Sequence, residues 1–298
     1  MRVFVTGATG FIGTAVVPEL LAAGHQVLGL TRSDKGAETL KSLGVEAHRG
    51  SLEDLESLKK GASSADATIH LAFDHNFADF EGINKKDRVA IEAIGEALVG
   101  TNRPFIITSG TLLLPLEKLA TEDDNGDYTI PTAVRGLAEQ LTLSFVPKGV
   151  RAEVVRLPPT NYGEGDHGFI AMLIKTAREK GESAYIGDGS NRWPATHRLD
   201  TAKVFASALD RGTAGATYHA VANEGITAKE IAEAIGKELN VPVVSKSTEE
   251  APAHFGFLAL PFSRDNPTSS KKTREALGWE PAQPGLIADI KEGHYFKN

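Results

Sequence analysis

A glycine-rich stretch at residues 6–13, TGATGFIG, constrains the fold more than any other part of the chain. The apolar run at residues 1–5 before it predicts a buried strand, and residues 14–23 after it have apolar positions at helical spacing. Gly7 permits a sharp turn off the strand, Gly10 permits an anion to approach the backbone closely, and Gly13 permits tight packing of the helix. The stretch therefore predicts a phosphate-binding turn at the N-terminus of a helix. The alternative is a glycine-rich turn that binds no ligand.

The residues after the second predicted strand indicate which dinucleotide such a turn would hold. Residues 25–30 predict that strand, and Thr31 and Arg32 follow it. An acidic residue at this point would hold the ribose 2′-hydroxyl of NAD, whereas an arginine accommodates the 2′-phosphate of NADP. A guanidinium can donate two N–H groups to one phosphate. The sequence therefore predicts NADP, with NADPH preferred over NADH, unless Arg32 is simply a solvated residue at a strand end.

Strands and helices alternate through the first half of the chain, which is typical of a parallel sheet with crossover helices. Further strands are predicted at residues 45–50, 67–72, 105–109 and 152–157, and helices at residues 52–61, 84–99 and 132–145. Ser51 is the expected cap of the first of these helices. We predict an α/β fold, a Rossmann-type doubly wound parallel sheet with a smaller C-terminal α/β lobe. Residues 1–160 would form the NADP-binding domain, and residues 161–298 would form mainly the substrate-binding lobe, packed on the first without a linker.

Composition narrows the possible partners and sites. The 298 residues carry a formal net charge of −7 without a basic block, so nucleic acid and anionic membranes are poor partner candidates. There is no cysteine, which excludes disulfides, thiolate metal sites and a cysteine nucleophile. No signal peptide or membrane-spanning run is apparent, so a cytoplasmic protein acting on a small molecule is expected. No metal is predicted, because Asp74 and His75 have no third ligand at metal-site spacing.

Six segments, in order along nearly the whole chain, resemble the extended or atypical short-chain dehydrogenases/reductases, often labelled NAD-dependent epimerase/dehydratase. The first three are similar to the TGxxGxxG turn, the Gly-Asp-Leu segment at the adenine and the strand ending in His-Leu-Ala. The last three are similar to the Arg-x-Pro…Tyr-Gly segment beside the nicotinamide, the His-Val-Asp-Asp turn and the C-terminal Leu-Gly-Trp-x-Pro. They lie at residues 6–13, 50–52, 66–72, 156–163, 197–200 and 277–281. Ser51 replaces the acid of the second segment.

The turn and the resemblance together imply a set of cofactor-binding residues on the turn, at the strand ends and beside the nicotinamide. These are Gly7, Thr9, Gly10, Phe11, Ile12, Gly13, Arg32, Ser51, Leu52, Leu71, Ala72, Phe73, Thr108, Ser109, Arg135, Leu157, Pro158 and Pro159. The resemblance also implies a homodimer with a four-helix interface built from the helices at residues 84–99 and 132–145. Val89, Leu137 and Leu141 could supply its apolar surface, although the same side chains could instead face the sheet.

The proton donor usual in this family is absent from its expected position. That donor is the tyrosine of Tyr-x-x-x-Lys, whose lysine helps to bind the nicotinamide ribose. Residues 138–141 resemble the end of the helix that carries this pair, which puts Arg135 at the lysine position and Pro131 at the tyrosine position. A proline cannot donate a proton, and an arginine cannot shuttle one at neutral pH. Tyr128 could replace the missing tyrosine only if the loop shifts the register.

Other side chains are therefore candidates for catalysis. Ser109 and Thr111 follow the fifth strand, where the family has its catalytic Ser or Thr, although hydroxyl residues also favour turns. Tyr162, His75 and His167 are candidate proton donors, and Tyr162 is favoured because it follows the segment expected to line the nicotinamide.

Trp193 and His197 are the candidate substrate residues. A single histidine is nevertheless more often a hydrogen-bonded structural residue than a catalytic one.

Two classes of function remain. The first is an NADP(H)-dependent oxidoreductase acting on a small carbonyl, alcohol or sugar-like substrate, with a nucleotide-sugar epimerase or dehydratase as the enzymatic alternative. That alternative is disfavoured because such reactions depend on the tyrosine that Pro131 replaces. The second class is an NADP(H)-binding sensor without catalysis, which the same missing tyrosine would explain.

Overall fold

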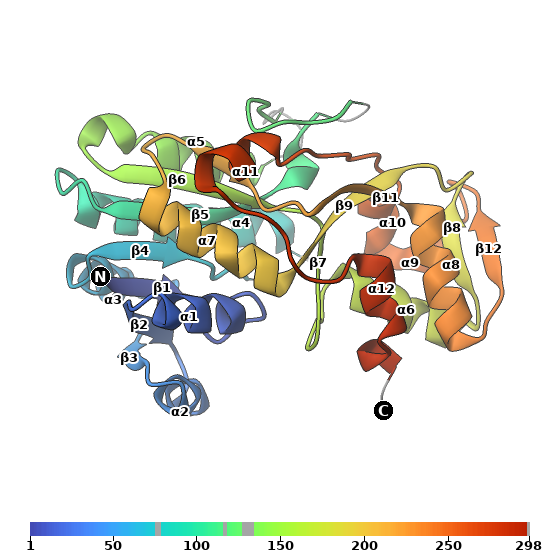
Figure 1. The fold of residues 1–298 in the computed structure, drawn as a ribbon, viewed down its shortest axis with the longest axis horizontal. Coiled ribbons are helices and arrows are strands. Elements are labelled where there is room, and N and C mark those ends of the chain that lie inside the picture. Colours follow the sequence, from blue (N-terminus) through green and yellow to red (C-terminus); the bar gives the residue numbers. More distant parts are fainter. Residues whose placement is uncertain (75–78, 116–117, 127–133, 297–298) are drawn as a thin grey trace.

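The computed structural model describes residues 1–74, 79–115, 118–126 and 134–296. Within them, the largest sheet has seven strands in the order β10-β6-β5-β4-β1-β2-β3, and every pairing in it is parallel (Figure 1). Its strands are β1 (Arg2–Thr6), β2 (Gln26–Thr31), β3 (Glu46–Arg49), β4 (Ala67–His70), β5 (Pro104–Gly110), β6 (Arg151–Leu157) and β10 (Thr217–His219). The strand order runs outward from β1 in both directions, so the predicted doubly wound fold is confirmed.

Helices cover both faces of this sheet because its strands are apolar on both sides. In β1, Val3 and Val5 pack with α1 (Gly13–Ala22), α2 (Asp34–Ser42) and α7 (Arg198–Arg211). Phe4 points to the opposite face and packs with α3 (Leu55–Ser63), α4 (Phe80–Leu98) and α5 (Gly136–Leu143). Because successive side chains point to opposite faces of a strand, both faces of the sheet are apolar and each is covered by a layer of helices.

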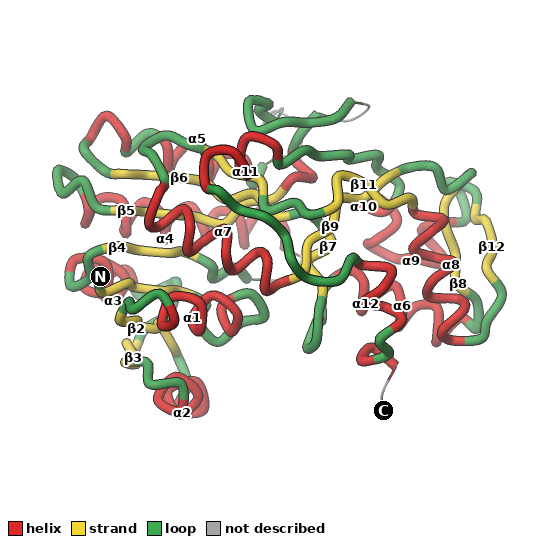
Figure 2. The backbone as a smooth tube through the Cα atoms, in the orientation of Figure 1, coloured by secondary structure: helices red, strands yellow, loops and turns green. Residues whose placement is uncertain are grey.

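The second half of the chain contains two smaller sheets (Figure 2). One contains β7 (Thr160–Tyr162), β9 (Arg192–His197) and β11 (Asn223–Thr227), and the other pairs β8 (Ser183–Ile186) with β12 (Val243–Lys246). Around them lie α6 (Phe169–Lys180), α8 (Ala228–Leu239), α9 (Ala251–Phe255), α10 (Ala259–Phe262) and α12 (Leu286–Lys291). Three later elements belong instead to the large sheet or pack on it: β10, α7 and α11 (Lys271–Leu277). The boundary near residue 160 stays a prediction.

The starts of α3 and α4 differ from those expected from the sequence. The cap of α3 is Asp54, whose carboxylate accepts from the N–H of Ser57 at 3.1 Å, whereas Ser51 accepts from Glu53. The prediction of Ser51 as the cap was therefore wrong, since both side chains suit an N-cap and the helix begins later. Helix α4 begins four residues earlier than expected, because the Asp79 carboxylate accepts from the N–H of Gly82 at 3.0 Å.

A buried ion pair joins the central sheet to the helix layer. Arg156 of β6 donates to both carboxylate oxygens of Glu139 in α5, at 2.9 and 2.7 Å. The same guanidinium donates to the carbonyl of Asp124 at 2.7 Å and lies 3.3 Å from Nε2 of His219. Burial, together with the neighbouring Arg156, lowers the pKa of His219 to about 4, so this histidine is neutral near pH 7. The network fixes the end of β6, from which residues 157–159 leave the sheet.

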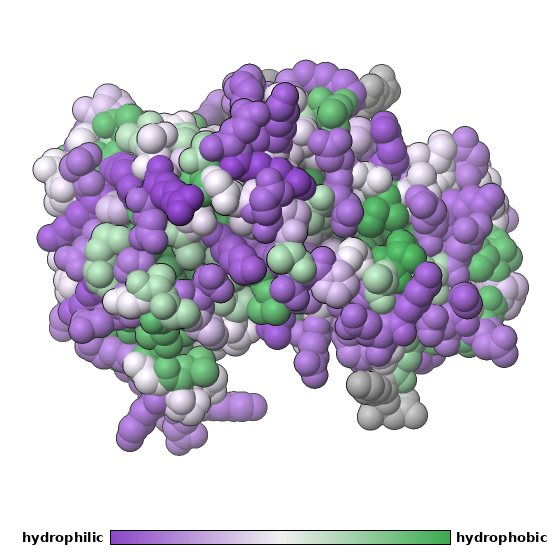
Figure 3. Space-filling model, viewed as in Figure 1, coloured by the Kyte–Doolittle hydropathy of each residue, from purple (hydrophilic) through white to green (hydrophobic). Residues whose placement is uncertain are grey.

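None of the helices in the part of the chain that the structure describes combines the length and apolar character needed to cross a lipid bilayer. The molecular face that carries α1 and α7 is mostly hydrophilic, with small scattered groups of hydrophobic residues (Figure 3).

Candidate cofactor site and active-site edge

The glycine turn connects β1 to α1 with little space behind it and open space in front. Gly7 has φ +70°, and a Cβ on it would lie 2.7 Å from the backbone nitrogen of Ala72. A Cβ on Gly13 would lie 2.0 Å from the carbonyl oxygen of Gly7. A Cβ on Gly10 would approach only the Gly7 oxygen, at 3.2 Å, with no other heavy atom of the described residues within 4 Å. Gly7 and Gly13 are therefore needed for packing, and Gly10 leaves a cradle that fits a pyrophosphate.

The remaining turn residues surround this cradle. Thr9 is exposed, and Phe11 and Ile12 are half-buried. The Gly10 N–H closes the turn by donating to the Gly7 carbonyl at 2.9 Å. The N–H groups of Thr14 and Ala15 already donate to the carbonyls of Gly10 and Ile12, at 2.8 and 3.0 Å. Among the described residues, the N–H groups of Phe11 and Ile12 have no such backbone acceptor, so these two are available to an anion at the start of α1.

The end of β4 lies directly beside the turn. The Thr6 hydroxyl accepts from the Ala72 N–H at 3.2 Å and is 2.8 Å from Nδ1 of His70. Nε2 of His70 lies 3.1 Å from a carboxylate oxygen of Asp87 in α4, and both side chains are buried. His70 and Asp87 are not among the candidate residues that the sequence indicates. The only signal was the position of His70 in the His-Leu-Ala strand ending, which indicates a strand end but not its polar partner.

Arg135 joins this network from the start of α5. Its guanidinium donates to the carbonyl of Thr108 at 2.8 Å and lies 3.8 Å from the centroid of the Phe73 ring. It is also 3.7 Å from the Asp87 carboxylate. Burial lowers the pKa of Arg135, while the Asp87 and Glu139 carboxylates oppose that shift. Three of the predicted cofactor residues thus lie together near the ends of β4 and β5 and the start of α5, namely Phe73, Thr108 and Arg135.

The segment expected to line the nicotinamide leaves the end of β6. Leu157 is paired in register with Gly110 of β5. The Pro158 carbonyl accepts from the Asn161 side chain at 2.9 Å, and Pro159 is half-buried. This segment therefore lies at the same edge of the sheet as Arg135 and Thr108.

On the other side of the turn, Arg32 is exposed after β2. Asp34 is the nearest acid after it in sequence, and its carboxylate is paired with the Arg49 guanidinium at the end of β3. The Gly50 N–H donates to the Thr31 carbonyl at 3.2 Å, so residues 50–52 run beside the end of β2. Ser51 and Leu52 are both half-buried there.

The two hydroxyl candidates after β5 differ in their surroundings. Thr111 is fully buried, and its hydroxyl donates to the side-chain oxygen of Asn266 at 2.9 Å, while the Asn266 amide donates to the Thr111 carbonyl at 3.0 Å. These bonds give Thr111 a structural role. The Ser109 hydroxyl is also buried, but it has no hydrogen-bond partner within the described ranges. It remains available to a bound group.

Among the candidate proton donors, Tyr162 is 1% exposed and its hydroxyl donates to the carbonyl of Pro284 at 2.7 Å. Burial raises the pKa of Tyr162 further above its ordinary value. These contacts argue against the favoured role of Tyr162, because β7 enters the smaller sheet and directs the hydroxyl to the C-terminal segment. His167 is exposed, and its ring centroid lies 5.8 Å from that of Phe11 in the glycine turn. His75, Tyr128 and Pro131 lie outside the described residues.

The two candidate substrate residues both pack within the second half. Trp193 is 1% exposed and donates from its indole to the Pro261 carbonyl at 3.2 Å. Nδ1 of His197 accepts from the N–H of Leu199 at 3.2 Å and so caps α7. Burial lowers the pKa of His197, which favours its neutral form. These contacts are those of framework residues, because β9 lies in the middle of its sheet.

Three possible metal ligands lie together near the C-terminus. Single ligand atoms of Asp289, Glu292 and His294 are within 4.8 Å of one another. One carboxylate oxygen of Asp289 is 3.5 Å from Nε2 of His294. Burial raises the pKa of Asp289 to about 6. The absence of a metal stays a prediction.

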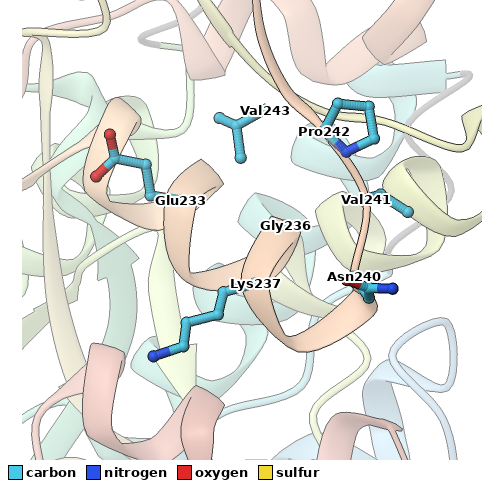
Figure 4. A pocket seen from close by; sticks show the side chains of 7 residues that line it. All are labelled: Glu233, Gly236, Lys237, Asn240, Val241, Pro242 and Val243. Carbon is cyan, nitrogen blue, oxygen red and sulfur yellow. The ribbon is translucent and has the colours of Figure 1, made fainter.

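A hollow of about 470 Å³ lies between the last turn of α8 and the chain that leads to β12 (Figure 4). It is lined by Glu233, Gly236, Lys237, Asn240, Val241, Pro242 and Val243. Figure 1 places α8 at the opposite end of the molecule from α1. Because none of the predicted cofactor or catalytic residues lines it, this hollow is not the candidate active site.

Comparison with known proteins agrees with this geometry. Residues 3–97 match the model of the NAD dependent epimerase/dehydratase family. The chain is 52% identical over 297 residues to the "Uncharacterized protein C2A9.02" of Schizosaccharomyces pombe, covering 99% of this chain and 100% of that protein. It is 28% identical to the "4-hydroxy-2-methyl-3-oxo-4-farnesyl-3,4-dihydroquinoline-1-oxide ketoreductase" of Stigmatella aurantiaca, covering 73% of this chain and 67% of that protein.

A solved structure of the same fold is that of MoeE5 in complex with UDP-glucose and NAD. It superposes with a TM-score of 0.75 at 21% identity, covering 98% of this chain and 96% of MoeE5. The fold, the glycine turn and the matched family model lead to one conclusion: the chain belongs to the NAD dependent epimerase/dehydratase family of extended short-chain dehydrogenases/reductases.

Proposed function

We propose that the protein is an NADP(H)-dependent oxidoreductase that reduces a ketone or aldehyde of a small molecule, or oxidises the corresponding alcohol. The observation that carries this proposal is the open space at Gly10, in the turn between β1 and α1 whose Gly7 packs against Ala72 after β4. When bound, the cofactor would supply or accept the hydride. A ketone is the favoured substrate group, because the Stigmatella relative is named a ketoreductase.

We propose that the described residues bind the cofactor at three places. The glycine turn and the start of α1 would hold the pyrophosphate. Arg32 would hold the 2′-phosphate, and the pairing of Asp34 with Arg49 reduces the repulsion that the Asp34 carboxylate would otherwise exert on that phosphate. Arg135, fixed by Thr108 and Phe73, would contact the nicotinamide ribose in place of the family's lysine.

Reduction of a carbonyl also requires a proton or a hydrogen bond at its oxygen. Ser109 has a buried hydroxyl without a partner among the described residues, at the end of the strand that carries Thr108. His167 is exposed beside Phe11, and its imidazole ring can donate or accept a proton. We propose that Ser109 orients the substrate oxygen and that His167 exchanges the proton with it.

The test is a screen of small ketones, aldehydes, alcohols and nucleotide sugars with NADPH or NADP, following the absorbance of the reduced nicotinamide. Stoichiometric consumption of NADPH with a carbonyl compound would support the proposal. Conversion of a nucleotide sugar without net change in cofactor would favour an epimerase or dehydratase instead. Tight cofactor binding without turnover of any compound would favour the sensor, which Pro131 at the usual tyrosine position motivates.

We also propose a homodimer formed through α4 and α5. Val89 on α4 is 39% exposed, and Leu137 and Leu141 on α5 are half-buried. Light scattering at micromolar concentration should give twice the mass of one chain, and Val89→Glu should lower it to that of a monomer. Leu43→Glu, on a 37% exposed leucine after α2, is the matched control and should leave the dimer intact. A monomeric mass for the unmodified protein would contradict the proposal.

The cytoplasmic location stays a prediction.

A further inference from the structure

An arginine from the second half of the chain lies against the glycine turn. Arg198 is the first residue of α7, and its guanidinium donates to the Thr14 hydroxyl at 3.2 Å. The carbon of the guanidinium is 5.3 Å from the centroid of the Phe11 ring. Thr14 in turn donates its hydroxyl to the Phe11 carbonyl at 3.1 Å. These contacts hold a permanent positive charge beside the first turn of α1.

The charge of Arg198 is not compensated at this place. The N-terminus of a helix carries partial positive charge, so a cation beside it is repelled unless an anion lies between them. The first turn of α1 contains no acidic residue. Over the described part of the chain Arg198 forms no ion pair, and its Nε is buried without a hydrogen-bond partner. In contrast, Arg135 and Arg156 at the same edge of the sheet both have carboxylate partners.

We infer that Arg198 binds the pyrophosphate of the dinucleotide, together with the N–H groups at the start of α1. This inference rests on the proposed function. Within the described residues, an anion in the Gly10 cradle would satisfy the N–H groups of Phe11 and Ile12 and the orphaned Nε donor of Arg198 at once, through charge-assisted hydrogen bonds. Because Arg198 begins α7 and directly follows β9, it connects the second half of the chain to the cofactor site.

The experiment is calorimetric titration of the unmodified protein and Arg198→Met with three probes: NADPH, NADH and ADP-ribose. All three contain a pyrophosphate, and ADP-ribose lacks the nicotinamide. Arg198→Met should weaken binding of all three by a similar factor, roughly 10- to 100-fold, because the interaction lost is common to them. Arg198→Lys should recover part of the affinity, because it restores the charge but not the guanidinium geometry.

Arg178→Met is the matched control, since Arg178 is an exposed arginine of α6 and its replacement removes the same charge elsewhere. It should leave all three affinities unchanged. Thermal unfolding of each variant establishes that it is folded, and Arg198→Gln replaces the methionine variant if that one is not.

The outcomes separate this inference from the proposed function. If the unmodified protein binds all three probes and the Arg198 variants bind them equally well, the inference is overturned while the proposed function stands. Loss of NADPH binding alone would place Arg198 at the 2′-phosphate and would also overturn it. If the unmodified protein binds none of the three, the proposed function and the inference both fail.

Discussion

Replacing Gly10 with leucine should lower the affinity for both NADPH and NADH by roughly 100-fold or more while leaving the protein folded. Gly10 does not have the left-handed backbone conformation that strains other residues, and a Cβ there meets only the Gly7 oxygen, at 3.2 Å. A larger side chain would instead fill the cradle and keep phosphate oxygens away from the N–H groups of α1. Calorimetry measures the affinities, and thermal unfolding reports on the fold.

The other two glycines of the turn would not give so clear a test. A Cβ on Gly13 would overlap the Gly7 carbonyl at 2.0 Å, so its replacement would disturb the backbone itself. The matched control is Gly285→Leu, at an exposed glycine with φ −68° that lies outside the turn, and it should bind both cofactors normally. Normal cofactor affinity in a folded Gly10→Leu variant would show that the dinucleotide does not use this cradle.

Replacing either Ser109 or His167 with alanine should slow hydride transfer by roughly 100-fold or more, the loss typical when a hydrogen-bond donor to the reacting oxygen (Ser109) or a general acid (His167) is removed. Within the described residues the buried Ser109 hydroxyl has no hydrogen-bond partner, and the His167 ring lies beside Phe11 of the glycine turn. The rates should be measured in single turnovers at saturating cofactor, once a substrate is known. Cofactor affinity is measured separately, so that a binding defect is not mistaken for a chemical one.

Tyr162→Phe is the informative control for this pair. Its hydroxyl donates to the Pro284 carbonyl, so the variant should lose about 1 kcal/mol of stability and keep a near-normal rate of hydride transfer. Slow hydride transfer in Tyr162→Phe, with near-normal rates in the Ser109 and His167 variants, would make Tyr162 the proton donor in their place. Near-normal rates in all three would direct attention to His75 and Tyr128.

The part of the site that could be predicted from the sequence is the part built from local chain. The strand, the glycine turn and the helix of residues 1–22 are contiguous, so their spacing alone predicts their geometry. The contact of Arg198 with Thr14 joins residues 184 positions apart, and no local pattern encodes it. The same is true of the buried pair formed by His70 and Asp87, which is set by how α4 packs on the sheet.

Closeness in sequence does not determine where a side chain points, as Tyr162 shows. Tyr162 follows the segment expected to line the nicotinamide by only three residues, which made it the favoured donor. The chain enters β7 at Thr160 and joins a different sheet, and the tyrosine hydroxyl is thereby directed to Pro284. His167 is farther along the chain, yet its loop returns to Phe11. The sequence pattern does not specify which sheet the chain joins after residue 159, so the direction of the Tyr162 hydroxyl could not be predicted.

We propose that the glycine turn and Arg32 form a site for NADP(H). Titrating the unmodified protein with NADPH and with NADH in a calorimeter tests this central claim most directly. Arg32 is exposed after β2, and Asp34 is occupied by Arg49, so NADPH should bind at least about 10-fold more tightly. In Arg32→Gln the two affinities should become similar through loss of NADPH binding alone. Equal affinities in the unmodified protein, or a preference for NADH, would contradict the account.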